Sequence, residues 1–291
     1  TLMRAAGDAV KPGYLMVVGA VLQVALGPVF IFGLFGFSQM GLAGAAIAFV
    51  AARTVSFLMY VYYVYKDDLL IFDLNNFWQS SRDIMHVGLP AILSNIIGPV
   101  SMSVITRLLA GHGAVVVAGF SVASRIETMF AMVMWALSMS VAPFVGQNWG
   151  AKYFKRVTRS LRIGNLFALA WGGFSYLLLI VLGPFVISLV NSDQEVIDAA
   201  TVYLMIVPLG MGLMGVMSNC MSSFNALGQP GPPFIMSVCQ MIFLSIPFAI
   251  LGDYLFGYRG IFAGGVLSIL IIALISYVWL KRNIRFGELQ G

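Results

Sequence analysis

Two charged side chains, Arg125 and Glu127, stand near the start of the otherwise apolar stretch SVASRIETMFAMVMWALSMSVAPFVGQ at residues 121–147. Charges inside an apolar helix are costly in hydrocarbon, so they are candidates for binding ions or small molecules. The two residues lie about 200° apart around a helix and cannot pair with each other, so each needs its own partner or water. As working groups they would line a water-filled cavity, where Glu127 could take up a proton or attract a cation. As structural groups they would instead hold backbone groups or neighbouring helices.

Other polar groups within long apolar runs also have both a functional and a structural interpretation. Arg53 could face a water-filled cavity or an anionic partner, or it could pack against another part of the molecule. The amides of Asn95 and Asn219 could hydrogen-bond a bound molecule or bridge two helices, and bridging is the commoner role in membranes. The pair Gly98-Pro99 is a candidate hinge, because proline removes a backbone hydrogen bond and permits a kink, although most such kinks are static.

The sequence contains no residue cluster that is typical of an enzyme or a metal centre. His86 and His112 lie in connecting segments, and no cluster of His, Asp and Glu shares a helix face. Cys220 and Cys239 lie inside apolar runs without metal-binding spacing, as buried small side chains do. There is also no nucleotide-binding motif. We therefore expect no catalytic residue, no metal and no cofactor.

The composition places these polar groups in a membrane protein. Of the 291 residues, 60% are hydrophobic and 9% are charged, and the mean hydropathy is +0.95, whereas soluble domains carry about 25% charged residues. Long apolar runs recur along the chain and predict transmembrane helices. The expected fold is an all-α integral membrane protein, a polytopic helical bundle of about eight spans. These spans are 14–35, 42–65, 87–109, 114–142, 161–182, 197–224, 233–256 and 260–280.

The connections between the predicted spans differ in charge. One face carries most of the basic residues, whereas the opposite face carries, of these, only Arg259. By the positive-inside rule the basic face, which includes both ends of the chain, is cytoplasmic. The basic segment KYFKRVTRSLR at 152–162 is interpreted mainly as this topology signal, with binding of acidic lipid head groups as the alternative. The residues of the basic face are Arg4, Lys11, Lys66, Arg82, Lys152, Lys155, Arg156, Arg159, Arg162, Lys281, Arg282 and Arg285.

An internal repeat organises the chain. Gly7 and Pro12 correspond to Gly228 and Pro233 at one common separation, and a further glycine follows at a similar distance in both copies. In the second copy four predicted helices, over 87–224, precede the matched segment, and the first copy has no counterpart before it. We therefore expect an N-terminally truncated chain, whose complete form has two six-helix lobes around a midplane site.

The repeat and the one polar break in the chain define the expected domains. Residues 1–66 would be the C-terminal part of the first lobe, and 67–86 a cytoplasmic linker between the lobes that lies on the membrane interface. Residues 87–285 would form the complete second six-helix lobe, followed by a tail at 286–291.

Four segments resemble the multidrug and toxic compound extrusion (MATE) transporters. They are GLPAILSNI at 88–96, LLAGHGAVVVAGFSVASRIE at 108–127, VGQNWGAKYFKRV at 145–157 and SSFNALGQP at 222–230. The resemblance implies twelve helices in the intact protein, arranged as a V-shaped pair of lobes, and efflux by exchange against H⁺ or Na⁺. In the Na⁺-coupled branch, acids stand in helices 7 and 10, and the corresponding runs here contain none, which favours H⁺.

The resemblance therefore implies an antiporter of the bacterial cytoplasmic membrane that exports amphipathic, often cationic compounds. The expected partners are such small molecules and membrane lipids, with no nucleic acid, and the full-length protein is expected to be monomeric. Two alternatives stay open. One is a flippase for a lipid-linked precursor, which would call for a more cationic cavity than Arg53 and Arg125 offer. The other is a membrane scaffold without transport.

Overall fold

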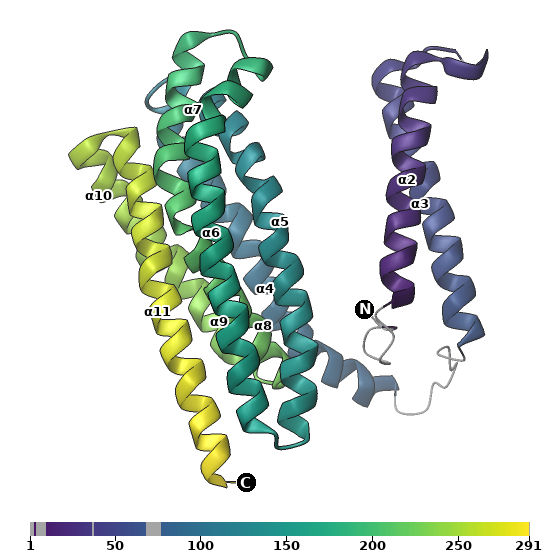
Figure 1. The fold of residues 1–291 in the computed structure, drawn as a ribbon, viewed down its shortest axis with the longest axis vertical. Coiled ribbons are helices and arrows are strands. Elements are labelled where there is room, and N and C mark those ends of the chain that lie inside the picture. The colour runs from purple at the N-terminus through teal and green to yellow at the C-terminus, as the bar shows by residue number, and fades with distance from the viewer. Residues whose placement is uncertain (1–2, 4–9, 37, 68–76, 291) are drawn as a thin grey trace. The chain divides into compact units, whose positions relative to one another are not determined.

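The computed structural model describes the chain except residues 1–2, 4–9, 37, 68–76 and 291, and every element in the described part is a helix (Figure 1). The chain divides into two compact units, Thr1–Phe77 and Trp78–Gly291. Among the described residues, seven helical spans are long and apolar enough to cross a membrane, and Ile96–Ala110 adds a shorter apolar stretch. The predicted all-α polytopic architecture is therefore confirmed.

The first unit is a helical hairpin. Helix α2 (Val10–Phe32) runs antiparallel to α3 (Gly41–Lys66), and the 3₁₀ turn η1 (Leu34–Gly36) lies in their connection (Figure 1). At the open end of the hairpin, Lys11 Nζ lies 2.7 Å from Asp67 Oδ2. Both helices expose apolar side chains on most of their surface, as expected for helices that face lipid.

The second unit is a bundle of six helical rods. Two of these rods are interrupted, one by a 3₁₀ turn and the other by a π-helical segment. The elements are α4 (Phe77–Ala110), α5 (Ala114–Gly150), α6 (Phe154–Val190), α7 (Gln194–Ile206) with η2 (Val207–Gly210) and α8 (Met211–Ala226), α9 (Gly231–Val238) with η3 (Cys239–Ser245) and α10 (Ile246–Phe256), and α11 (Tyr258–Gln290).

A proline marks each of the two interrupted rods. Pro208 stands inside the 3₁₀ turn η2, and Pro247 in the first turn of α10, directly after the π-helical segment. A proline has no backbone N–H and clashes with the preceding turn, so regular α-helical bonding is lost beside it. Pro143 and Pro184, in contrast, lie within α5 and α6, which continue past them.

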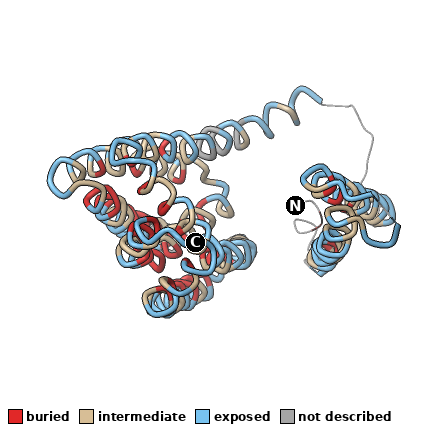
Figure 2. Tube along the Cα trace, turned by 90° about the horizontal axis from the view of Figure 1, so that it is seen from above, coloured by how far each residue is buried: buried red, intermediate tan, exposed pale blue. Residues whose placement is uncertain are grey.

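The core of the second unit consists of two clusters of buried side chains. The cluster nearer the connection 110–114 draws side chains from α4 to α8, α10 and α11, and includes Phe120, Tyr203 and Phe262. The cluster nearer the connection 150–154 joins α5, α6, α8, α9 and α11 and includes Phe224 and Leu280. Figure 2 shows the buried residues gathered on the inward faces of the rods and the exposed ones outside.

The two predicted repeat copies fold as similar hairpins, α2 with α3 and α10 with α11. In each hairpin a glycine of the second helix lies against the backbone carbonyl of a phenylalanine in the first. Gly44 lies against Phe30, and Gly264 against Phe248. A side chain at either glycine would collide with that carbonyl, so the small residue is what permits the close helix contact.

Several helices extend further than the apolar runs predicted. Helices α5 and α6 each have 37 residues, about 55 Å at 1.5 Å per residue, against about 30 Å of hydrocarbon. Helix α4 begins at Phe77, within the predicted linker 67–86, and α11 continues to Gln290, within the predicted tail. The added turns of α4 and α6 contain exposed Lys, Arg and Gln side chains, which favour helix and keep their polar ends in water. The interfacial part of the linker at 68–76 lies outside the described residues.

Candidate functional site

The site centres on Glu127, which lies in the middle part of α5. Among the described residues it is the only carboxylate more than about two helical turns from the end of its helix. The Tyr203 hydroxyl, on α7, donates a hydrogen bond to Glu127 Oε2. Tyr203 stands one turn before the interruption at η2, so a break in the helix lies directly beside the carboxylate's partner.

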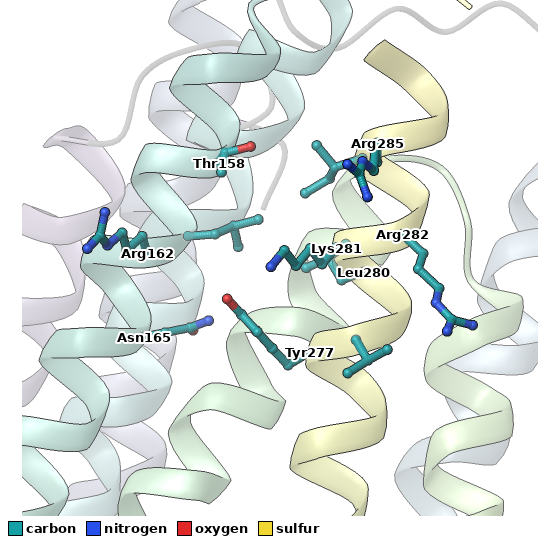
Figure 3. A pocket seen from close by; sticks show the side chains of 11 residues that line it. Thr158, Arg162, Asn165, Tyr277, Leu280, Lys281, Arg282 and Arg285 are labelled. Atoms are coloured by element: carbon teal, nitrogen blue, oxygen red, sulfur yellow. The ribbon is translucent and has the colours of Figure 1, made fainter. Parts of the chain in front are cut away.

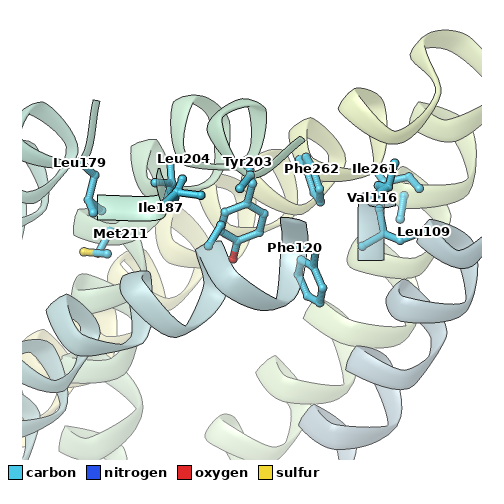
Figure 4. Close-up of a cluster of buried hydrophobic side chains, with 13 residues drawn as sticks. Leu109, Val116, Phe120, Leu179, Ile187, Tyr203, Leu204, Met211, Ile261 and Phe262 are labelled. Carbon is cyan, nitrogen blue, oxygen red and sulfur yellow. The ribbon is translucent and has the colours of Figure 1, made fainter. Parts of the chain in front are cut away.

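Aromatic rings pack around Tyr203. The Tyr203 ring lies edge-on to Phe120 of α5 at 5.5 Å between centroids, and to Phe262 of α11 at 5.0 Å. Tyr258 packs edge-on against Phe262 at 6.1 Å. Tyr203 is 5% exposed, and its hydroxyl points toward α5 (Figure 4). This packing fixes the direction of the phenol group, because edge-to-face contacts hold each ring at a set angle.

Glu127 is half-buried and has no basic partner among the described residues. Within that part of the chain no Lys, Arg or His lies within ion-pair distance of its carboxylate, and Tyr203 is its one hydrogen-bond donor. An acid in an apolar span without a cation beside it must bind a proton, a cation or water to offset the cost of its charge. Glu127 can therefore take up a proton or attract a cation.

Arg125 does not join this site. It is exposed, and the structure gives it no ion pair or hydrogen bond with any described residue. This agrees with the spacing argument that Arg125 and Glu127 lie on different faces of α5. Arg53 lies in the other unit, where its guanidinium carbon stands 5.1 Å from the centre of the Phe49 ring and the residue is exposed.

Asn219 bridges three helices instead of facing a cavity. It is fully buried in α8, and its Oδ1 accepts a hydrogen bond of 2.9 Å from Ser138 Oγ of α5. Its Nδ2 donates to Asn165 Oδ1 of α6 over 3.2 Å. These contacts match the bridging interpretation of a membrane amide, the commoner of the two considered.

The candidate hinge and Asn95 all lie within α4. The helix runs without interruption from Phe77 to Ala110, so Gly98 and Pro99 stand inside a continuous helix. The Pro99 carbonyl accepts a hydrogen bond of 3.0 Å from Ser103 Oγ. The side chain of Asn95 lies outside the described residues, so its role stays a prediction.

No sequence pattern pointed to Tyr203 as the partner of Glu127. A tyrosine in the apolar run TVYLMIVPLG is typical of ordinary core packing, and it lies 76 positions from Glu127. The one available signal is that Tyr203 precedes Pro208 by about one turn, and a proline weakens the helical bonding beside it. The contact between Tyr203 and Glu127 is seen only in the structure, where α5 packs beside α7.

The part of the chain that holds this site matches a known family. The family model described as MatE matches residues 90–251, more than half of the chain, and this range includes both Glu127 and Tyr203. The chain belongs to the MatE family. This confirms the resemblance seen in the sequence.

Several MatE relatives match nearly the whole chain. A FAD transporter of Shewanella oneidensis is 28% identical over 96% of this chain and 63% of its own length. A probable multidrug resistance protein, NorM of Thermotoga maritima, is 23% identical over 99% of this chain and 64% of its own length. The chain thus spans just under two thirds of these relatives.

Solved structures of MATE transporters share the fold. The crystal structure of the Vibrio cholerae MATE transporter VcmN in the bent form superposes with a TM-score of 0.87 at 29% identity, and the match covers 99% of this chain and 65% of that one. This MatE chain is therefore a multi-pass membrane protein of a bacterial transporter family.

Proposed function

We propose that this MatE chain belongs to an ion-gradient-driven antiporter that exports amphipathic, often cationic compounds across the bacterial cytoplasmic membrane. The observation that carries the proposal is Glu127, an acid in an apolar span with a phenol donor and no basic partner among the described residues. Relatives named as multidrug resistance or multidrug export proteins support the class of substrate.

In this proposal Glu127 binds the proton and the cationic compound in turn. The carboxylate attracts an organic cation when it is charged, and a proton entering down its gradient neutralises it and releases that cation. Tyr203 holds the carboxylate through both states, and the interruption at η2 gives α7 a place to bend as the site opens and closes.

We propose H⁺ as the coupling ion in preference to Na⁺. A proton needs one basic oxygen, and Glu127 with one hydroxyl partner supplies that. No cofactor takes part in the proposed cycle. The protein would act as a monomer in contact with lipid.

Flux through reconstituted vesicles tests the proposal. Ethidium export by the protein is measured with an imposed pH gradient, an imposed Na⁺ gradient or none, for the wild type and for Glu127→Gln. We expect ethidium flux to depend on the pH gradient. In Glu127→Gln we expect this flux to fall roughly tenfold, a factor within the usual range for the coupling between two bound ligands. The glutamine oxygen of this variant still accepts the Tyr203 hydrogen bond, so the change removes the charge with little effect on packing.

Glu195→Gln provides the matched control. Glu195 is exposed in the first turn of α7, and its replacement removes one carboxylate outside the span. We expect wild-type flux from it. Flux in Glu127→Gln that equals the wild type and keeps its pH dependence would reduce Glu127 to a structural residue, and the absence of gradient-dependent flux would overturn the transport proposal.

A second candidate substrate is a flavin dinucleotide. The relative from Shewanella oneidensis, which matches 96% of this chain, is named a FAD transporter. The same vesicles, loaded with FAD in place of ethidium, test this candidate through the fluorescence of exported flavin. Gradient-driven flux of ethidium without any flux of FAD would exclude it.

A further inference from the structure

A cavity of about 790 Å³ lies between α6 and α11, at the basic end of the second unit. It is separate from Glu127, because its lining residues Leu161, Leu280 and Ile284 belong to the other buried cluster. Thr158 and Arg162, from the basic segment 152–162, also line it. That segment was interpreted above mainly as a topology signal.

The groups directed into this cavity are hydrogen-bond donors. Figure 3 shows Thr158 and Asn165 on α6 facing Tyr277 and Lys281 on α11 across the gap. The side-chain amide, the ammonium and the two hydroxyl groups can all donate to one bound molecule. Such a set, held by two helices, matches the several oxygen atoms of an oxyanion.

Asn165 carries the most specific signal. It is 7% exposed, and its Oδ1 already accepts the hydrogen bond from Asn219. Its Nδ2 is buried and has no partner among the described residues, whereas buried amide groups in folded proteins nearly always have one. In Figure 3 this nitrogen points toward α11, into the cavity. The unpaired donor therefore marks the place of a missing acceptor.

The charge of the cavity has one sign. Four of the lining residues are basic, Arg162, Lys281, Arg282 and Arg285, and none of the described lining residues is acidic. Within the described part of the chain none of the four has a carboxylate partner. Figure 3 shows Lys281 directed across the gap, while Arg162 and Arg282 extend away from it. Their positive potential would attract an anion, and Lys281 would contact it directly.

We propose that this cavity is a binding site for a phosphate group, held by Asn165, Lys281, Tyr277 and Thr158. The phosphate would belong either to the head group of an anionic phospholipid or to a soluble phosphorylated compound. Basic pockets between helices at the cytoplasmic surface are a known setting for anionic lipid head groups. The site is independent of the transport proposal, because its lining includes neither Glu127 nor Tyr203.

Thermal unfolding of the full chain in uncharged detergent micelles tests this site. In one arm, phosphatidylglycerol is titrated into the micelles, with phosphatidylcholine as the reference. In the other arm, sodium pyrophosphate is titrated, with sodium chloride at equal ionic strength as the reference. We expect a saturable rise in Tm in at least one arm that the reference does not produce, since a ligand that binds only the folded state stabilises it.

The variants Asn165→Asp and Lys281→Gln locate the site. The aspartate of the first variant keeps an oxygen for Asn219 and replaces the amide donor by a negative charge. Lys281 is exposed, so its replacement leaves the core unchanged and remains informative if Asn165→Asp fails to fold. We expect each to weaken the apparent affinity by roughly tenfold, the value of one charge-assisted hydrogen bond.

Arg159→Gln is the matched control. It removes the same charge from an exposed position on α6 that does not line the cavity, and we expect less than about a twofold change in affinity, as for other surface substitutions. A response to pyrophosphate would identify a soluble phosphorylated ligand, and a response to phosphatidylglycerol alone a lipid head group. No saturable response in either arm, or equal losses in Arg159→Gln and Lys281→Gln, would overturn the proposal.

Discussion

At the scale of single residues, the environment of each polar group separates its possible roles. Asn219 uses both ends of its amide on other helices, and Arg125 is exposed without a partner among the described residues. Glu127 combines a carboxylate, partial burial and a neutral donor. A hydroxyl donor leaves the negative charge in place, whereas a basic partner would have neutralised it. Glu127 can therefore still respond to protons and cations.

Removal of the phenol group tests this contact. Tyr203→Phe should leave Glu127 without its donor and lower the free energy of unfolding by about 1–3 kcal/mol, measured as a lower Tm in detergent. Tyr258→Phe makes the same change in the same aromatic cluster, where the tyrosine hydroxyl has no hydrogen bond to a described residue, and should alter stability by less than about 0.5 kcal/mol. Equal effects of the two changes would contradict the role given to Tyr203.

At the scale of helices, glycine contacts set how closely the rods approach. In the second unit, Gly172 lies against the backbone of Gly212, and Gly252 against that of Gly260. Lipid tails are as apolar as the helix faces, so the hydrophobic effect does not drive two helices together in a membrane. Close van der Waals packing drives their association instead. Gly173, the residue after Gly172 on α6, makes no such contact, and a side chain there would enter open space.

The glycine pair of α11 provides a test with an internal control. Gly264→Ala places a methyl group against the Phe248 carbonyl and should destabilise the protein by about 1–3 kcal/mol through overpacking. Gly265→Ala, one position along, enters open space and should stabilise by about 0.5–1 kcal/mol through helix propensity. Thermal unfolding of both variants measures the difference, and a stabilising Gly264→Ala would show that α10 and α11 do not need this contact.

At the scale of the whole molecule, the two ends of the bundle differ in charge. In the second unit the connection 150–154 and the end of α11 carry basic residues, whereas the connection 190–194 carries Asp193 and no basic residue. By the positive-inside rule we expect the first end to face the cytoplasm. The phosphate-binding cavity would then open toward the cytoplasmic leaflet.

Cysteine labelling in cells tests this orientation. Ser192→Cys and Ala151→Cys place exposed thiols beyond opposite ends of α6. A thiol reagent that cannot cross membranes should label the Ser192→Cys variant in intact cells, and the Ala151→Cys variant only after the membrane is permeabilised. The wild type gives the background of Cys220 and Cys239, of which Cys220 is buried. The reverse pattern would place the basic end outside.

The sequence by itself determined the helical membrane fold, the approximate number and position of the spans, and the family. Hydropathy, charge in the connections and motifs such as SRIE are local properties, readable without knowing which helices touch. The lengths of the helices were predicted less well from the sequence. Helices such as α6 and α11 continue past their apolar runs into polar residues, which a hydropathy analysis assigns to loops.

Only the tertiary structure decided which groups the polar residues contact. Tyr203 reaches Glu127 because α7 packs beside α5, and the two residues are 76 positions apart. Asn165, an ordinary amide in the sequence, became the marker of the cavity because Asn219 occupies its oxygen and leaves its nitrogen unpaired among the described residues. Hydrogen-bond partners depend on how helices cross and rotate, and that is set by close packing over many residues at once.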